Sequence, residues 1–269
     1  MSAKNTKGDA RAAAKAKAQA QVRAQERRTT MMIIAGSVVG LALFAGLIFF
    51  IVNQSKVPEL GADGAVAPAA ADATGGIPVG TGGVVGEDVP TDAPRVDVYL
   101  DFMCPICGTF EAINSDDLDT LRESGDISLY YHPISILDRF SSGTEFSTRS
   151  AGAAGVIADQ APEYFSDFVA TMFANQPEEN TTGLSDDEIA DLATLVGVPD
   201  DVVANLDDTD FKKWATAATE QASVDGMQGT PTVRVSASGD FADGEILDPN
   251  EVSYFTEGAL KAYLEGLGS

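Results

Sequence analysis

One segment limits the possible architectures of this chain more than any other. Residues 31–52 read MMIIAGSVVGLALFAGLIFFIV, a run of 22 residues without a charged side chain. As a helix, such a run is long enough to cross the roughly 30 Å hydrocarbon layer of a bilayer. A cleaved signal peptide would have an apolar core of about 7–15 residues with a cleavage site directly behind it. Here the nearest Ala-x-Ala, Ala65–Ala67, comes 13 residues later, so we predict an uncleaved transmembrane anchor.

The charges on the two sides of this apolar run are opposite in sign. The whole chain has 17 Lys and Arg against 41 Asp and Glu, a formal net charge of −24. Residues 1–30 have a net charge of +6, and the residues from 53 onward have −30. Because basic flanks stay in the cytoplasm, we predict a cytoplasmic basic tail at 1–30 and an extracytoplasmic domain behind the anchor. The acidic excess argues against nucleic acid as a partner, because phosphate binding needs clustered Lys and Arg.

The segment behind the anchor has the composition of a tether. Residues 53–74 are rich in Ala, Gly, Pro and Asp and show no periodicity, so we predict a flexible linker. The glycine-rich residues 75–86 lack the spacing and the preceding strand of a nucleotide-binding fingerprint, and we expect a short edge hairpin there. Residues 75–269 are enough for one well-buried core.

Hydropathy patterns in residues 75–269 predict an α/β domain whose helices gather in the middle. Apolar periodicities of two and of 3.6 residues indicate strands and helices, respectively. The order is β-α-β, a helical block at about 143–224, then β-β-α. We predict strands at 96–102, 127–132, 232–236 and 241–247, and helices at 104–122, 145–159, 165–173, 185–196, 211–222 and 248–267. Two helix starts carry capping signals, namely Ser185 with Glu188, and Asp248 followed by Pro249.

The only two cysteines, Cys104 and Cys107, lie three residues apart after a predicted strand and at the start of a predicted helix. Positions i and i+3 there bring the Cα atoms within a bridging distance of ~5–6 Å. The first thiol lies at the positive end of the helix dipole, which lowers its pKa and makes it the nucleophile. A disulfide across so short a loop adds little stability, and it can persist outside the cytoplasm. We therefore predict a redox-active pair with Cys107 as the resolving thiol.

Metal and haem chemistry fit these cysteines less well. Zinc needs about four ligands, and the chain offers two cysteines and one histidine, His132. A c-type haem motif requires His directly after the second cysteine, where this chain has Gly108. We predict no metal site and no cofactor, and we expect His132 to have a structural role at a strand end.

The sequence Gly229-Thr230-Pro231-Thr232-Val233 places a proline at the mouth of a strand, where proline is allowed. A cis Thr230–Pro231 bond would present the backbone of Thr230 to an incoming extended peptide. A trans turn is the commoner conformation of such a dipeptide. Together with the cysteine motif, the pattern predicts Thr230 and Pro231 as substrate-binding residues.

Three stretches, VDVYLDFMCPICGTFE, YYHPISILD and GTPTV, resemble the thioredoxin superfamily, and specifically the membrane-anchored DsbA-like thiol-disulfide oxidoreductases of actinobacterial type. The resemblance covers about residues 75–269. It implies a thioredoxin-like fold with an inserted all-helical domain, Cys104 as attacking thiolate, Cys107 as resolving thiol, and Pro231 as a cis-proline with Thr230 facing the substrate. It also implies two partners, namely reduced unfolded secreted proteins and a membrane-bound protein that re-oxidises the pair.

The chain departs from that family in two places. Many relatives have a buried carboxylate six residues before the first cysteine, where this chain has Val98, and Asp97 and Asp101 belong to the opposite strand face. The dipeptide between the cysteines is Pro-Ile, whereas the best-known members have Pro-His. Without that histidine we expect Cys104 to be less acidic, which leaves the redox direction open.

We predict an enzyme that introduces disulfides into secreted or cell-envelope proteins through Cys104 and Cys107. A disulfide reductase or isomerase of the same fold is the nearest alternative. A second alternative is a Cu(I)-binding chaperone using Cys104, Cys107 and His132, because soft thiolates suit Cu(I). A third is an adhesion or scaffold module without redox activity.

Overall fold

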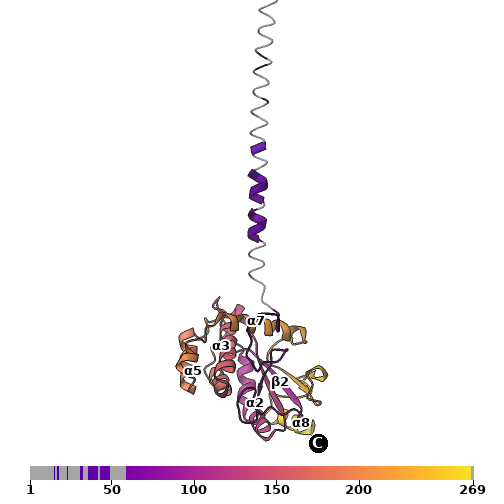
Figure 1. Ribbon diagram of the computed structural model, residues 1–269. Helices are drawn as coiled ribbons and strands as arrows, with labels where there is room; N and C mark the ends of the chain where they lie inside the picture. Colours follow the sequence, from indigo (N-terminus) through magenta and orange to yellow (C-terminus); the bar gives the residue numbers. More distant parts are fainter. Residues whose placement is uncertain are drawn as a thin grey trace, which may run out of the picture. The chain divides into compact units, whose positions relative to one another are not determined.

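The computed structural model describes residues 59–267 without a gap, and before them only residues 15, 17, 23, 31–32, 36–41 and 43–48. The chain divides into two units, Met1–Lys56 and Val57–Ser269 (Figure 1). In the first unit, residues 36–41 and 43–48 are helical and exposed. Within these described residues, no helix combines the length and the apolar character needed to cross a bilayer. Much of the predicted tail at 1–30 and part of the predicted anchor at 31–52 lie outside the described residues.

The second unit is built around a five-stranded sheet in the order β1-β3-β2-β4-β5. Its strands are β1 (Ile77–Val79), β2 (Arg95–Leu100), β3 (Ser128–Pro133), β4 (Thr232–Ser236) and β5 (Glu245–Ile246). β2 and β3 are parallel, and the other neighbours are antiparallel. A parallel pair needs a crossover connection, and here it is the helix α2 (Pro105–Ser124). The predicted α/β architecture is confirmed.

All six residues of β2 are buried, because the central strand is covered on both faces. Val96, Val98 and Leu100 belong to the main core, which includes Phe110 of α2. On the opposite face, Tyr99 packs in a second cluster that also contains Ala222 and Met227. The alternation of apolar and polar residues along β2 therefore separates two buried faces of the sheet, and neither face is exposed to solvent. The end of β2 is a rigid position from which to present the residues that follow.

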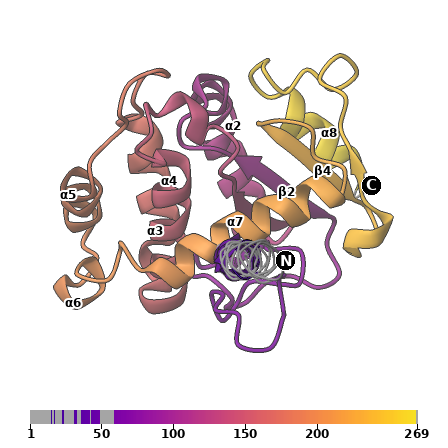
Figure 2. The ribbon, with the colours of Figure 1, turned by 90° about the horizontal axis from the view of Figure 1, so that it is seen from above.

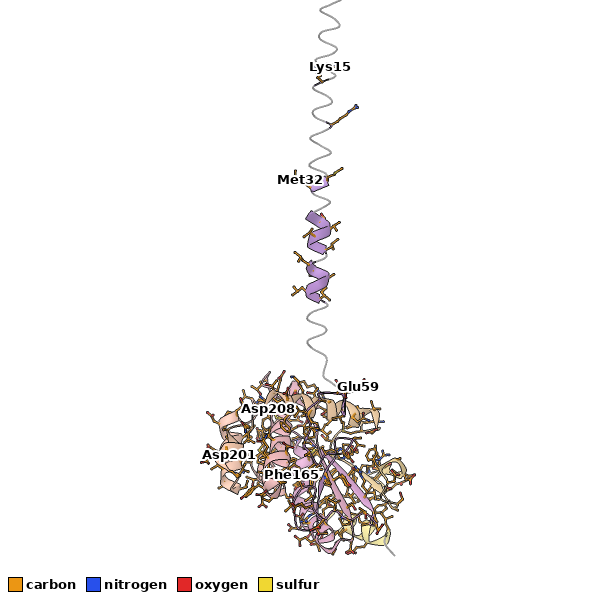
Figure 3. All side chains as sticks on the ribbon, viewed as in Figure 1. Lys15, Met32, Glu59, Phe165, Asp201 and Asp208 are labelled. Atoms are coloured by element: carbon orange, nitrogen blue, oxygen red, sulfur yellow. The ribbon has the colours of Figure 1, made fainter. Side chains whose placement is uncertain are left out.

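The interval between β3 and β4 is helical. Its helices are α3 (Phe146–Gln160), α4 (Phe165–Ala174), α5 (Asp186–Val196), α6 (Asp200–Val203) and α7 (Thr209–Val224). α3 and α7 lie side by side, and α5 lies at the outer side of the domain (Figure 2). Phe165 is fully buried, whereas Asp201 and Asp208 are exposed (Figure 3). The capping box of Ser185 and Glu188 at the start of α5 is present as predicted.

The second half of the predicted linker differs from a flexible tether. The Asp72 carboxylate accepts hydrogen bonds from the backbone N–H groups of Thr74 and Gly76, and it pairs with Arg95 of β2 at 2.7 Å. The backbone N–H of Ala69 donates to Asp159 at 2.9 Å. Side-chain hydrogen bonds and a partly buried ion pair therefore hold residues 69–74 on the domain, although the Ala- and Gly-rich composition of the segment is typical of a linker. Residues 53–58 lie outside the described residues.

The prediction for the last helix is wrong at its start. The helix α8 runs over Ala259–Leu267, and its buried residues are Leu260 and Leu264. The Asp248 carboxylate accepts a hydrogen bond from the backbone N–H of Asn250 at 2.8 Å, which closes a local turn. The same side chain can cap either a turn or a helix, and here the chain remains in turns up to Gly258, whose φ is +72°. The predicted strand at 241–247 is likewise reduced to β5.

Candidate active site

The two cysteines lie where β2 passes into α2. Cys104 is the N-cap of α2, with φ −82° and ψ 111°, and Pro105 takes the first turn of the helix. The backbone N–H groups of Cys107 and Gly108 donate to the Cys104 carbonyl at 2.9 and 3.3 Å. Both cysteines are free thiols. This is the geometry predicted from the motif, and we call residues 102–108 the redox turn.

The two thiols have opposite acid strengths. A hydrogen bond from the Cys107 thiol, helped by the backbone N–H groups of Cys107 and Ile106, lowers the pKa of Cys104 to about 6 against the opposing effect of burial. Burial, reinforced by the hydrogen bond and charge of Cys104, raises the pKa of Cys107 far above its ordinary value. These contacts make Cys104 more acidic than an ordinary thiol without the histidine of the family's best-known members. Near neutral pH the pair therefore holds one thiolate and one thiol.

Access to the two sulfur atoms is also unequal. Cys104 keeps 5 % of its surface exposed and Cys107 keeps none, so an incoming sulfur can reach only Cys104. Ile106, between them, is 55 % exposed and adds apolar surface beside the reactive sulfur. The site thus offers one reachable sulfur, next to an apolar side chain.

The predicted substrate-binding residues are adjacent to this sulfur. The Thr230–Pro231 peptide bond is cis, and it directly precedes β4, the neighbour of β2 in the sheet. The Cys104 sulfur lies 3.4 Å from the Thr230 carbonyl oxygen, to which the thiol donates when it is protonated. The structure therefore brings Thr230 to Cys104 across 126 residues of sequence, as the motif predicts.

Asp101, to which the sequence pattern assigned no role, is fully buried three residues before Cys104. Its carboxylate accepts hydrogen bonds from the Met103 N–H at 2.9 Å, the Leu137 N–H at 3.0 Å and the Ser147 hydroxyl at 2.7 Å. Burial raises the pKa of Asp101 to about 7. The carboxylate connects the redox turn to the loop after β3 and to α3. Its signal in the sequence, an acidic residue just past a strand, is common in ordinary turns.

A second carboxylate without a predicted role is Glu111, one turn beyond Cys107 on α2. It is 6 % exposed, and its Oε2 atom has no hydrogen-bond partner. Burial, with a further contribution from Asp119, raises the pKa of Glu111 to about 7. The residue lines a cavity of about 190 Å³ between α2 and α4, together with Gly108 and Phe173.

His132 lies in a buried cluster of polar side chains from β2 and β3. Its Nε2 lies 2.8 Å from Asp97 Oδ1, and its ring stacks on Tyr99 with 4.0 Å between centroids. Arg95 also binds Asp97, so the histidine is part of a buried polar cluster. No group of three or more His, Cys, Asp or Glu side chains in the described part of the chain could hold a metal ion.

The fold and this dithiol define a class of protein, the thioredoxin-type domains that exchange thiols and disulfides at a helix start. The family model described as Thioredoxin matches residues 80–250. The chain belongs to this family.

Several solved structures are similar to the domain. MdbA, a thiol-disulfide oxidoreductase from Actinomyces oris, is 27 % identical with a TM-score of 0.53, over 65 % of this chain and 81 % of that chain. DsbA from Mycobacterium tuberculosis is 28 % identical with a TM-score of 0.52, over 65 % and 83 % of the two chains. BdbD from Bacillus subtilis, at 19 % identity with a TM-score of 0.57, covers 76 % of this chain and 98 % of that chain and shows the fold alone.

Curated relatives share only part of this chain. The serine/threonine-protein kinase PknE of Mycobacterium tuberculosis is 31 % identical over 148 residues. The match takes in 51 % of this chain and 26 % of the kinase. The chain therefore spans about a quarter of the length of the curated relatives that it matches.

Proposed function

We propose that this protein is a thiol-disulfide oxidoreductase that introduces disulfides into secreted or cell-envelope proteins. The observation that carries the proposal is the contrast between the two thiols, a reachable Cys104 with a pKa of about 6 and a fully buried Cys107. The similar structures of MdbA and DsbA support the same activity.

The reaction runs through a mixed disulfide. A substrate thiolate attacks the Cys104 sulfur of the oxidised pair, and Cys107 leaves as a thiolate that takes up one proton. The substrate's second thiolate then attacks the substrate sulfur that is bonded to Cys104, the substrate disulfide forms, and Cys104 leaves as a thiolate. Two electrons pass from the substrate to the cysteine pair. Because low-pKa thiols leave readily, the acidity of Cys104 favours release of the oxidised substrate.

The same acidity supports the oxidising direction. A protein that stabilises its reduced form is the stronger oxidant, and the Cys107 thiol and backbone N–H groups stabilise the Cys104 thiolate. The reductase or isomerase alternative would be favoured by a less acidic first cysteine. The copper alternative needs His132 as a third ligand, and its partners are Asp97 and Tyr99 instead.

The proposal includes a location and partners. The uncharged run at 31–52 and the change from basic to acidic flanks support a membrane anchor with residues 1–30 in the cytoplasm. The domain would then act outside the membrane on reduced unfolded proteins. A membrane-bound partner would re-oxidise the Cys104–Cys107 pair after each turnover.

Oxidative refolding of a reduced secreted protein by the detergent-solubilised full chain tests the activity. The oxidised wild type is expected to restore the substrate's disulfides stoichiometrically, and Cys104→Ser to restore none. The proposal fails if the wild type and Cys104→Ser give the same yield. Protease digestion of intact cells tests the topology, because an extracytoplasmic domain is cut from outside and a cytoplasmic domain is protected.

A further inference from the structure

One side chain of the helical block reaches the backbone of the redox turn. Gln176 follows α4, and its Nε2 donates hydrogen bonds to the carbonyl of Phe102 at 3.0 Å and to that of Cys104 at 2.8 Å. The bonds join residues more than 70 positions apart in the sequence. The mechanism above does not use Gln176, and no motif in the sequence points to it.

The two carbonyls that Gln176 binds lie on either side of Met103, in the backbone that orients the Cys104 sulfur. The Cys104 carbonyl also accepts the N–H groups of Cys107 and Gly108, so it forms the first turn of α2. The Phe102 carbonyl lies just before the Met103–Cys104 peptide. A side-chain amide has two N–H donors in one rigid plane. Its nitrogen therefore fixes the orientations of these two peptide groups relative to each other.

The redox turn is shaped to admit this amide. A Cβ atom on Gly108 would lie well inside van der Waals distance of Gln176 Oε1, and the nearest atoms around that position all belong to Gln176. Next to it, the rings of Phe102 and Phe173 pack with 5.0 Å between centroids, which holds the end of α4 against the turn. The Gln176 amide thus occupies the space that a side chain at position 108 would take.

We propose that Gln176 is a positioning residue for thiol-disulfide exchange, which holds the redox turn so that the N–H groups of Ile106 and Cys107 face the Cys104 sulfur. This inference rests on the proposed function. Those N–H groups favour the Cys104 thiolate, and hydrogen bonds to a charged acceptor are sensitive to geometry. Among side chains, Cys107, Thr230 and Asp101 also act on Cys104, and none of them has a hydrogen bond to Gln176. Without the amide, the turn would be free to move away from α4, and the thiolate would lose part of its stabilisation.

The test is Gln176→Leu in the full chain, which keeps the bulk and removes both hydrogen bonds. The Cys104 thiolate is titrated by its ultraviolet absorbance, and the rate of alkylation of the reduced protein is measured at pH 6 and pH 8. We expect the acid dissociation constant of Cys104 to fall by roughly threefold to tenfold, which is less than the loss of a whole hydrogen bond to a charged group, because the N–H donors are displaced and not removed. Alkylation of the reduced protein should slow by roughly twofold to fivefold at pH 6, where the wild type is about half thiolate, and much less at pH 8, where Cys104 is mainly thiolate in both proteins.

Two further variants keep the inference falsifiable. Asn175→Leu is the matched control, because the Asn175 side chain is exposed and donates only to Thr171 of its own helix; it should titrate like the wild type. Gly108→Ala keeps the glutamine at position 176 but pushes its amide away from the turn. It should therefore lower the acid dissociation constant of Cys104 as Gln176→Leu does, and the double variant should lower it little further. It also serves if Gln176→Leu does not fold.

The outcomes separate this inference from the proposed function. If Gln176→Leu and Gly108→Ala fold and titrate as the wild type does, the positioning role is overturned while the enzyme remains active. If the wild type itself fails to oxidise a substrate, the proposed function fails first. A lower unfolding temperature with an unchanged Cys104 titration would show that Gln176 serves stability alone, and it would also overturn the inference.

Discussion

At the scale of single residues, the hydrogen bond between the two thiols lowers the pKa of one and raises the pKa of the other. The donor is the buried Cys107, and it is the largest cause of the low pKa of Cys104. An acidic sulfur is normally explained by a helix terminus or a neighbouring cation. Here the donor is the second cysteine of the motif, which stabilises the Cys104 thiolate in the reduced protein.

Replacing the donor tests this account. In Cys107→Ala the pKa of Cys104 should rise from about 6 toward its ordinary value of 9.0. Alkylation of Cys104 at pH 6 should then slow by roughly tenfold for each unit of the rise. Cys107→Ser is the matched variant, because its hydroxyl still donates, and it should keep most of the acidity. Equal alkylation rates in both variants would show that the thiol donor is unimportant.

Glu111 should make stability depend on pH. Its pKa is raised to about 7 in the folded protein from an ordinary 4.5, so between these values the folded state binds more protons than the unfolded state. Stability from this group is therefore greatest at low pH and is lost as pH rises through about 7. At about 1.4 kcal/mol per pKa unit, the full effect is roughly 3 kcal/mol at most.

Glu111→Gln should remove that dependence. Urea unfolding of the reduced protein at pH 8 should show the variant to be more stable than the wild type, with little difference at pH 5. Glu220→Gln, at an exposed position of α7, should match the wild type at both pH values. A Glu111→Gln variant that is less stable than the wild type at pH 8 would mean that the buried carboxylate has a partner on which the fold depends.

The residues predicted from the sequence and those missed differ in one physical respect. Cys104, Cys107, Thr230 and Pro231 belong to short motifs whose chemistry follows from local spacing. Asp101, Glu111 and Gln176 act through burial or contacts that arise only when distant segments pack together. Carboxylates and amides are common on exposed surfaces, so their types alone predict no role.

At the scale of elements, helix starts were predictable where an apolar stripe follows the cap. Ser185 satisfies this condition and begins α5. Asp248 has an equally good capping side chain, but the residues up to Gly258 remain in turns, and only Leu260 and Leu264 of α8 are buried. The cap therefore specifies a helix only when the following residues can bury one face.

The contact between α3 and α7 depends on a residue without a side chain. A Cβ atom on Gly155 would lie 2.7 and 2.8 Å from two ring atoms of Trp214, which is itself 2 % exposed. Gly155→Ala gains up to about 1 kcal/mol of helix propensity, while overpacking costs about 1–3 kcal/mol. We expect a net loss of about 1 kcal/mol in chemical unfolding. Gly266→Ala in α8, where nothing lies within 4 Å of the added atom, should not destabilise, and equal behaviour of the two variants would contradict this packing argument.

At the scale of the whole molecule, the charge of the large segment selects among substrates. Residues from 53 onward have a net charge of −30, and charge of one sign attracts partners of the other at low salt. Of two peptide thiols with equal and opposite net charge, the basic one should be oxidised roughly tenfold or more faster at low ionic strength. Their rates should converge near 1 M salt, where the Debye length is about 3 Å. Rates that differ equally at all salt concentrations would assign the preference to contacts rather than to the field.

The central claim is that this cysteine pair oxidises other proteins, and its reduction potential tests the claim most directly. The Cys104–Cys107 pair of the full chain is equilibrated with glutathione buffers, and the reduced fraction is read by thiol alkylation. A stabilised Cys104 thiolate predicts a potential above the about −270 mV of thioredoxin, in the direction of the about −120 mV of a strong protein oxidant. A value at or below about −270 mV would contradict the account and assign the protein to the reductants.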